Sequence, residues 1–482
     1  MALGPFDSRA KRSRCLCCAE SHLKCSREFP CKTCVRRNLV CKYPGDSSIQ
    51  TITLDLGQHK TSMHYSNSVT NNAQVAYNHL PPLTQSPSSD STHRYIHYFG
   101  LFVQKNTFNP QCLSYDASIK SLLGTRGACP LVQAVLAIGA LEASKVEVNR
   151  PKEFSNYTSD VQFSLNSYSR AIITLRDYID SLETPSRIQV LWTTLLLGLF
   201  ELMHDPTGNG WIKHMVYGTS RAVEAAGPEF FRTEPGKSFF SQVRIFETCR
   251  TIVFNETTFL TRSDWAALSF GSREANFASP QHPLESLLDI ITMCAKLSAG
   301  AGNLIDTLDQ LDPVTVNETA NDLALEGHRL RRNLLLWNVT NSQMLNNSSV
   351  SNKFEDRFPV DSIAVLINAF FSAVSIYLSG IFDYNIYIWN DLGIPTPTLT
   401  EEDIQAHVRI ILHSTRCGLE RTSLSHLLHL FPLRVAGARC TTPWQREEIL
   451  ALLRNAKSSF SATEAFETEL TMLWRMNPRL PA

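Results

Sequence analysis

Three features of the sequence predict a mainly α-helical protein with a small cysteine-rich head. Residues 15–41 contain seven of the thirteen cysteines in the 482-residue chain. Residues 46–92 are rich in Ser, Thr, Asn, Gln and Pro without a periodic apolar stripe, which is typical of a disordered linker. From residue 93 to residue 482, apolar residues recur at helical spacing. We therefore expect a head at 15–45, a linker, and a large all-α body.

Six of the seven clustered cysteines form two copies of the pattern C-x2-C-x6-C. They are Cys15, Cys18 and Cys25 in the first copy and Cys31, Cys34 and Cys41 in the second. Zinc prefers four ligands in tetrahedral geometry, so two ions need eight bonds from six thiolates, and two of the sulfurs must bridge. Cys17 lies between the members of the first pair and is expected to be a spare thiol.

A disulfide framework is the alternative use of so many cysteines. Such frameworks form in secreted proteins, and the N-terminal segment MALGPFDSRAKRSR lacks the apolar region of a signal peptide. The other six cysteines are scattered without ligand spacing, and we expect them to be reduced, mostly buried thiols. The pattern therefore predicts two Zn²⁺ ions bound in the head.

The cysteine pattern resembles the fungal binuclear zinc cluster family (Zn2Cys6), whose spacing is met at all six positions. The resemblance implies that Cys15 and Cys31 bridge the ions, that Cys18 and Cys25 complete one site, and that Cys34 and Cys41 complete the other. It also implies a nuclear RNA polymerase II transcription factor that binds double-stranded DNA. In that family the first helix of the cluster enters the major groove at a CGG-type triplet.

Basic residues concentrate in the head. Residues 1–46 carry ten Lys and Arg against four Asp and Glu, a net charge of +6, and because the whole chain is neutral the other 436 residues carry −6. This distribution favours a polyanionic partner for the head, which begins with a basic arm at residues 1–14. Seven basic side chains are placed for phosphate contact. They are Lys11, Arg12, Arg14, Arg27, Lys32, Arg36 and Arg37.

The run AESHLKC, which ends at Cys25, corresponds to the part of the cluster that contacts bases in the family. We expect His22 and Lys24 to contact bases, because direct readout needs donors at the groove floor. Ala19 and Ser21 stand where the family usually has basic residues, which departs from the common pattern. The C-A-x-S sequence here resembles the cluster of the aflatoxin-pathway regulators, and this implies a pathway-specific regulator of a secondary-metabolite gene cluster.

Helical patterns fill the body. In segment 160–182 the apolar face is predicted to consist of Phe163, Tyr168, Ile172, Leu175 and Ile179. Further helical patterns occupy 187–204, 211–226, 238–260, 284–311, 318–339, 360–380, 401–431 and 444–474. Stretches such as PLVQAVLAIGALEASK and GWIKHMVYGTSRAVEAAG resemble the helical fungal-specific transcription factor domain, which implies a regulatory domain at 93–482.

The sequence pattern bears on two possible partners, a membrane and a second copy of the chain. The segment Ile188–Met203 is the one candidate for a membrane span, but it has sixteen residues and carries Gln189 and Glu201, whereas spanning takes about 20 apolar residues. We expect a buried core helix and no membrane partner. No a/d heptad follows the cluster, so a homodimer would have to form without a coiled coil at that place.

The body is not expected to be an enzyme. EPGKS at 234–238 ends like a phosphate-binding loop, but Phe231 stands where G-x4-G-K-S requires glycine. His413, His426 and His429 could share a helical face as metal ligands, but without a further ligand at suitable spacing they are predicted to be ordinary core or surface histidines.

The C-terminal run FSATEAFETELTMLWRM combines glutamates with an apolar face of Phe466, Leu470, Leu473 and Trp474. Such a helix could contact the transcription machinery, although docking of the apolar face on the core is the favoured interpretation. For the whole chain the rival hypothesis is a zinc-thiolate protein-interaction module on a helical scaffold or enzyme-like body. The charge of the head favours DNA.

Overall fold

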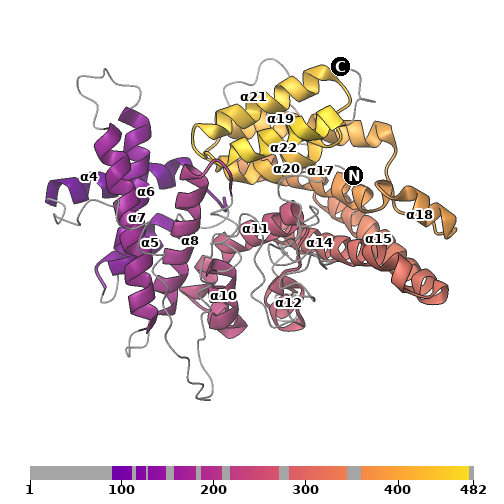
Figure 1. Cartoon of the computed structure of the whole chain (residues 1–482), viewed down its shortest axis with the longest axis horizontal. Coiled ribbons are helices and arrows are strands. Elements are labelled where there is room, and N and C mark those ends of the chain that lie inside the picture. Colours follow the sequence, from indigo (N-terminus) through magenta and orange to yellow (C-terminus); the bar gives the residue numbers. More distant parts are fainter. Residues whose placement is uncertain are drawn as a thin grey trace, which may run out of the picture.

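The computed structural model describes residues 89–110, 115–125, 129–147, 157–180, 186–208, 218–270, 282–343, 345 and 360–476. Within these ranges the chain is an array of α-helices and short 3-10 helices, and β-type pairing is limited to one bridge between Thr107 and Leu424 (Figure 1). The predicted all-α body is confirmed for these ranges. The cysteine-rich head and most of the predicted linker lie outside the described residues.

The first five helices in the described part of the chain form a bundle at one end of the molecule, drawn in indigo to purple in Figure 1. They are α4 (Ser89–Lys105), α5 (Tyr115–Leu123), α6 (Cys129–Glu147), α7 (Tyr157–Asp180) and α8 (Arg187–His204). Helix α6 packs against α4, α7 and α8. At its crossing with α4, a Cβ on Gly139 would lie 2.0 Å from the carbonyl oxygen of Tyr95, so this close approach requires glycine.

Helix α4 begins four residues before the predicted start of the body at residue 93, inside the segment 46–92 that composition assigned to the linker. Ser89 and Asp90 open the helix. Serine and aspartate suit the first turn of a helix as well as they suit a linker, because they can accept hydrogen bonds from the free N–H groups there. Composition therefore places this boundary only approximately.

The buried face of α7 differs from the predicted one. Of the five apolar residues expected to face the core, Leu175 is buried, and the others are only partly buried. The buried positions are Asp160, Ser164, Ser167, Ala171 and Leu175. These mostly small side chains let α7 approach α6, its main neighbour, closely, while the larger apolar residues fill the flanks.

The middle of the chain connects the bundle to a helical hairpin. Its elements are α10 (Ser220–Ala226), η3 (Pro228–Arg232), α11 (Gly236–Phe254), η4 (Phe259–Thr261), α12 (Ser263–Phe270), α14 (Pro283–Thr307), η5 (Leu308–Gln310) and α15 (Pro313–Thr340). The pattern predicted for 238–260 stops early because Asn255 adopts a left-handed conformation with φ of 51° and ends α11. Helices α14 and α15 are antiparallel, since the indole of Trp337 donates a hydrogen bond to the carbonyl oxygen of Pro283 at 3.1 Å.

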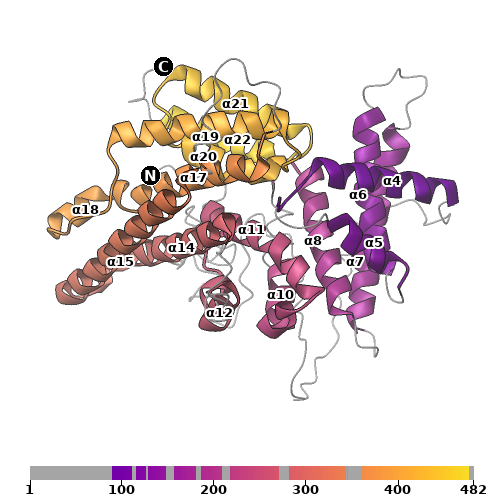
Figure 2. The ribbon, with the colours of Figure 1, turned by 180° about the vertical axis from the view of Figure 1, so that it is seen from behind.

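The C-terminal part packs around α17, seen from both sides in Figures 1 and 2. It consists of α17 (Ser362–Asp383), α18 (Ile386–Asp391), α19 (Glu401–Arg421), η6 (His426–His429), α20 (Leu430–Gly437), α21 (Pro443–Lys457) and α22 (Thr463–Met476). The single patterns predicted at 401–431 and 444–474 are wrong in that each contains a break. Helix α19 ends before a segment that pairs with the N-terminal bundle, and α21 and α22 are separated by a turn.

Both breaks join the C-terminal part to the N-terminal bundle. The N–H of Thr107 donates to the carbonyl oxygen of Ser423 at 2.8 Å, and the N–H of Ser425 donates back to Thr107 at 3.0 Å. In the second break the ring of Phe460 is buried, with its centroid 6.3 Å from that of Phe102. If the chain were helical through either break, the backbone of Thr107 or the ring of Phe102 would lose its partner. The apolar periodicity of a single segment contains no information about such distant partners.

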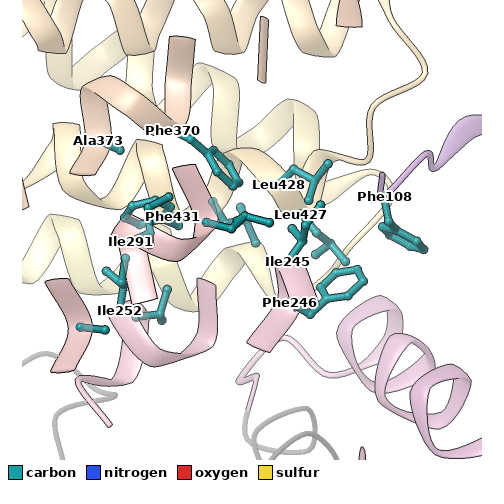
Figure 3. Close-up of a cluster of buried hydrophobic side chains, with 14 of the residues drawn as sticks. Phe108, Ile245, Phe246, Ile252, Ile291, Phe370, Ala373, Leu427, Leu428 and Phe431 are labelled. Carbon is teal, nitrogen blue, oxygen red and sulfur yellow. The ribbon is translucent and has the colours of Figure 1, made fainter. Parts of the chain in front are cut away.

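One continuous hydrophobic core runs through both halves. Figure 3 shows the place where α11, α14, α17 and the η6–α20 segment converge. The side chains labelled there are Phe108, Ile245, Phe246, Ile252, Ile291, Phe370, Ala373, Leu427, Leu428 and Phe431. Phe108 and Phe246 meet edge to face with ring centroids 4.7 Å apart, so the bundle and the centre of the molecule share this core.

Apolar helices of this body lie inside it. The predicted buried core helix at 188–203 is confirmed as the buried part of α8. The prediction that this is the one membrane-like segment is wrong, because Cys129–Val146 and Ser362–Asp383 are longer and also apolar enough to span a bilayer. These two segments are 72% and 94% buried within the structure, as expected of core helices in a folded protein.

Candidate functional site

The predicted metal ligands and DNA contacts all fall outside the described residues. The metal ligands are Cys15, Cys18, Cys25, Cys31, Cys34 and Cys41, and the DNA contacts are His22, Lys24, Lys11, Arg12, Arg14, Arg27, Lys32, Arg36 and Arg37. They remain predictions from the sequence. The structure bears instead on the candidate sites of the helical body.

His413, His426 and His429 do not form a metal site with one another. In the ranges that the structure describes, no three His, Cys, Asp or Glu side chains lie together in a way that could hold a metal ion. His429 is fully buried against Gly418, and desolvation lowers its pKa to about 3. His413 lies on α19, where its Nε2 is 3.7 Å from the sulfur of Cys417. His429 is therefore a neutral core residue, as the sequence analysis predicted.

The position that a phosphate loop requires to be glycine lies in the hydrophobic core. Phe231, which replaces the required glycine, is buried and packs against Phe240 and Trp265 with ring centroids 5.4 and 5.6 Å away. At the start of α11 the carboxylate of Glu234 accepts a hydrogen bond from the N–H of Ser238 at 3.2 Å. An acidic side chain therefore occupies the helix N-terminus where a phosphate would have to bind.

A buried ion pair lies on α11, and we call it with its partners the α11 ionic centre. Arg250 donates two hydrogen bonds to the carboxylate of Glu247, at 3.0 and 2.8 Å, and a third to Glu256 at 2.6 Å. The hydroxyl groups of Ser220 and Thr258 also donate to Glu247, at 2.8 and 2.7 Å. Every oxygen of the buried carboxylate is thus engaged, which is the condition for a charge to be tolerated inside a protein.

A second buried arginine of α11 connects it to α14. The guanidinium of Arg244 donates to the carboxylates of Glu285 and Asp289, and Arg244 and Asp289 are both buried. Two positions four residues apart on α14 therefore receive one side chain from α11. The sequence analysis missed both arginines. The available signal was the presence of Arg244, Glu247 and Arg250 within an otherwise apolar helical pattern.

A half-buried arginine of α15 has different partners, and we call this region the Arg331 centre. Its guanidinium donates to the carbonyl oxygens of Ser375, at 3.2 and 3.1 Å, and Pro397, at 3.3 and 3.1 Å. No carboxylate in the described part of the chain forms an ion pair with it. Desolvation lowers the pKa of Arg331. Nearby His407 is also desolvated and is repelled by Arg331, and its pKa is lowered to about 4.

Four of the five described cysteines are poor nucleophiles, because burial raises their pKa. Burial raises the pKa of Cys249 and of Cys294 to about 12, so both remain protonated thiols at neutral pH. Cys440 is buried as well, and its pKa is also raised by desolvation. The five described cysteines are free, and Cys129 is the exposed one. Cys294 and Cys440 are buried and Cys249 and Cys417 are partly buried, so the expectation of mostly buried thiols is met only in part.

The C-terminal helix α22 docks on the core. Phe466, Leu470 and Trp474 are buried, and the Trp474 indole donates to the carbonyl oxygen of Gly437 at 2.8 Å. Arg434 of α20 pairs with the buried carboxylate of Glu469 at 2.7 Å. The favoured interpretation is therefore confirmed. The aromatic face of this helix is covered, and its contact with the transcription machinery would need residues other than these.

These observations define a large all-helical domain whose buried polar groups mostly serve one another. The sequence model described as the fungal specific transcription factor domain matches residues 62–480, which is most of the chain. The chain therefore belongs to the fungal-specific transcription factor domain family and is a transcription regulator. The match begins inside the segment 46–92 that was predicted to be a linker. No curated protein and no solved structure matches the chain.

Proposed function

We propose that the chain is a sequence-specific, zinc-dependent transcription factor whose residues 15–45 bind DNA and whose helical body regulates that activity. One observation carries the proposal: the doubled C-x2-C-x6-C pattern stands directly N-terminal to a match to a transcription factor family. Six thiolates at this spacing are a suitable donor set for two Zn²⁺ ions. A family of transcription regulators also supports action in the nucleus on promoter DNA, together with the transcription machinery.

Zinc stoichiometry tests the ligand assignment. The wild-type chain should contain two zinc ions, because the six thiolates with two bridging sulfurs supply eight bonds. Cys31→Ser should lose both ions, since its sulfur would serve both. Cys17→Ser is the matched control and should keep two. Elemental analysis of the purified full-length chain measures this, and a Cys17→Ser chain with fewer than two zinc ions would show that the ligands are assigned wrongly.

A gel shift with the zinc-loaded full-length chain tests DNA binding. The chain should bind a duplex containing CGG triplets more tightly than a scrambled duplex of equal length and composition. Zinc chelation and Cys31→Ser should abolish this preference, and Cys17→Ser should retain it. If the chain holds two zinc ions but binds both duplexes equally weakly, the rival hypothesis of a zinc-thiolate protein-interaction module is favoured.

Two variants separate the proposed base contacts. Lys24→Ala should weaken binding at every pH, because lysine is a permanent donor. Binding by the wild-type chain should tighten between pH 8 and about pH 6, since histidine gains a proton in this range and the charged ring is favoured beside phosphates. His22→Lys should remove most of this pH dependence. A His22→Lys profile as steep as the wild-type profile would show that His22 does not face DNA.

We further propose that the targets form a secondary-metabolite gene cluster, which is supported by the resemblance of the segment from Cys18 to Ser21 to the aflatoxin-pathway regulators. Mapping of bound sites across the genome tests this. Bound promoters should be concentrated in one cluster of biosynthetic genes, and transcripts of those genes should change when the chain is deleted. Binding spread over unrelated promoters would contradict the pathway assignment while leaving the DNA-binding function intact.

A further inference from the structure

Helix α15 has one face buried in the molecule and an opposite face with exposed apolar side chains. Its buried positions include Ala320, Ala324, Gly327, Leu330 and Leu334, at the three- and four-residue steps of a packed helix face. On the outer face Val314, Leu325, Leu336 and Val339 are 66%, 67%, 59% and 73% exposed. Single exposed apolar residues are ordinary, but several on one helix face mark an interaction surface.

The outer face also carries charges in a regular order. At about 100° per residue, Val314, Glu318, Leu325, Arg332 and Leu336 lie within roughly 20° of one line along α15. We call these five residues the α15 stripe. From its N-terminal to its C-terminal end it is apolar, acidic, apolar, basic and apolar. Its apolar ends and its two charges are symmetrically spaced about Leu325.

The position of α15 leaves this stripe at the edge of the molecule. Figures 1 and 2 show the α14–α15 hairpin extending from the centre of the body, with α15 on its outer side. The opposite face is tightly packed, because a Cβ on Gly327 would lie 2.7 Å from the ring of Phe382 and 2.9 Å from Pro397. Within the described residues neither Glu318 nor Arg332 forms an ion pair.

We propose that the α15 stripe binds the same stripe of a second copy of this chain, with the two helices antiparallel and a two-fold axis passing through Leu325. In this register Leu325 meets its own symmetry mate. The residue numbers of two facing positions then sum to 650, which is twice 325. Val314 therefore lies opposite Leu336, and Glu318 lies opposite Arg332. Symmetry forms each of these two pairs twice, as in any isologous interface.

Charge complementarity selects this partner and this direction. A second copy supplies a basic residue for each acidic one and an apolar residue for each apolar one, so the surface is self-complementary. Parallel pairing in register would instead place Glu318 beside Glu318 and Arg332 beside Arg332, and like charges at a contact are repulsive. The pairing does not require DNA and therefore does not rest on the proposed function of the head.

The interface would be modest in size. A single pair of helices buries less than the ~1,200–2,000 Å² typical of a stable complex. The dimer should therefore be reversible and dependent on concentration. Sedimentation equilibrium of the zinc-loaded full-length chain without DNA should show a monomer–dimer equilibrium, and a chain that remains monomeric at all accessible concentrations overturns the proposal.

Substitution of the central leucine tests whether α15 is the surface involved. Leu325→Glu places two carboxylates at the two-fold axis and should raise the dissociation constant at least about tenfold. Ile173→Glu is the matched control, because Ile173 is an exposed apolar residue of α7, 48% accessible, outside the stripe. It should leave the dissociation constant unchanged. A dimer that Leu325→Glu does not weaken forms through another surface and overturns the proposal.

Charge reversal tests the antiparallel register. Glu318→Arg alone and Arg332→Glu alone each create two like-charge pairs across the axis and should raise the dissociation constant about three- to tenfold. The double reversal restores opposite charges and should return the constant to near the wild-type value. Far-UV circular dichroism checks that each variant is folded. Single reversals without effect, or a double variant weaker than both singles, overturn the register.

Discussion

The α11 ionic centre and the Arg331 centre both hold an arginine among helices, but they satisfy it differently. Arg250 faces the carboxylates of Glu247 and Glu256, so charge meets charge. Arg331 faces the carbonyl oxygens of Ser375 and Pro397, which supply hydrogen bonds without a full negative charge. In the second centre no carboxylate is a direct partner of the arginine. Desolvation lowers the pKa of Arg331, and desolvation followed by repulsion from Arg331 lowers the pKa of His407.

The difference predicts that loss of the arginine destabilises the two centres to different extents. At the α11 ionic centre, removal of the arginine should be strongly destabilising, because a buried carboxylate then loses its cation. At the Arg331 centre the direct partners of the arginine are neutral carbonyl oxygens, so its removal leaves those oxygens without donors. Arg250 is fully buried and Arg331 is half-buried; the first is a counter-charge, and the second connects α15, α17 and the segment before α19.

The largest expected effect is that of Arg250→Met. This change leaves the buried carboxylate of Glu247 without its positively charged partner and should lower the free energy of unfolding by about 3–5 kcal/mol. Urea denaturation followed by circular dichroism measures it. The double variant Arg250→Met with Glu247→Leu removes both charges and should recover part of the loss. If the double variant is less stable than Arg250→Met, the ion pair is not what makes the single change harmful.

The next effect is a dependence on acid that originates in the Arg331 centre. His407 has a pKa of about 4 in the folded chain, below the ordinary 6.5, so the unfolded chain binds more protons between these values. The free energy of unfolding should therefore fall as pH decreases from about 6.5 to about 4. The loss due to His407 should reach about 3 kcal/mol at pH 4.

His407→Leu isolates this contribution. The Nδ1 atom of His407 has no hydrogen-bond partner, so the replacement removes the titrating ring without breaking a bond at that atom. The slope of unfolding free energy against pH should become shallower between pH 6.5 and 4. Equal slopes for the wild-type chain and the variant would mean that His407 ionises normally and that the centre is more hydrated than its burial indicates.

Arg331→Met should have an intermediate effect, a loss of about 1–3 kcal/mol from two carbonyl oxygens without donors. It should also raise the pKa of His407, because one of the two influences that depress it, repulsion by Arg331, is removed. Denaturation and a histidine titration by NMR measure the two outcomes. A loss as large as that of Arg250→Met would erase the distinction between the two centres.

The smallest effect is that of Arg176→Met on the outside of α7. The guanidinium of Arg176 is exposed and lies 3.9 Å from Asp180, a surface pair of small value. Its replacement should change the free energy of unfolding by less than about 0.5 kcal/mol. A larger change would mean that any arginine-to-methionine substitution disturbs this body, and the effects at Arg250 and Arg331 would have to be measured against it.

A helix that is apolar and buried on nearly all sides was well predicted. The pattern at 187–204 corresponds to α8, Arg187–His204. Polar residues at both ends of the apolar run define where this helix begins and ends. The segment 401–431 was read as one helix because apolar residues continue at helical spacing on both sides of the break. The break exists because Ser423 and Ser425 bond to Thr107, more than three hundred residues away in sequence.

Local sequence determined which segments are helical, where the cysteines repeat and where basic charge collects, since each depends on residues that are near one another along the chain. Tertiary structure alone decided which charges are buried and what faces them. Arg250 and Arg331 both lie within helical patterns, and only packing shows that one meets a carboxylate and the other meets carbonyl oxygens. It also decided which apolar residues of α15 remain exposed, because burial depends on the neighbours that folding brings to each face.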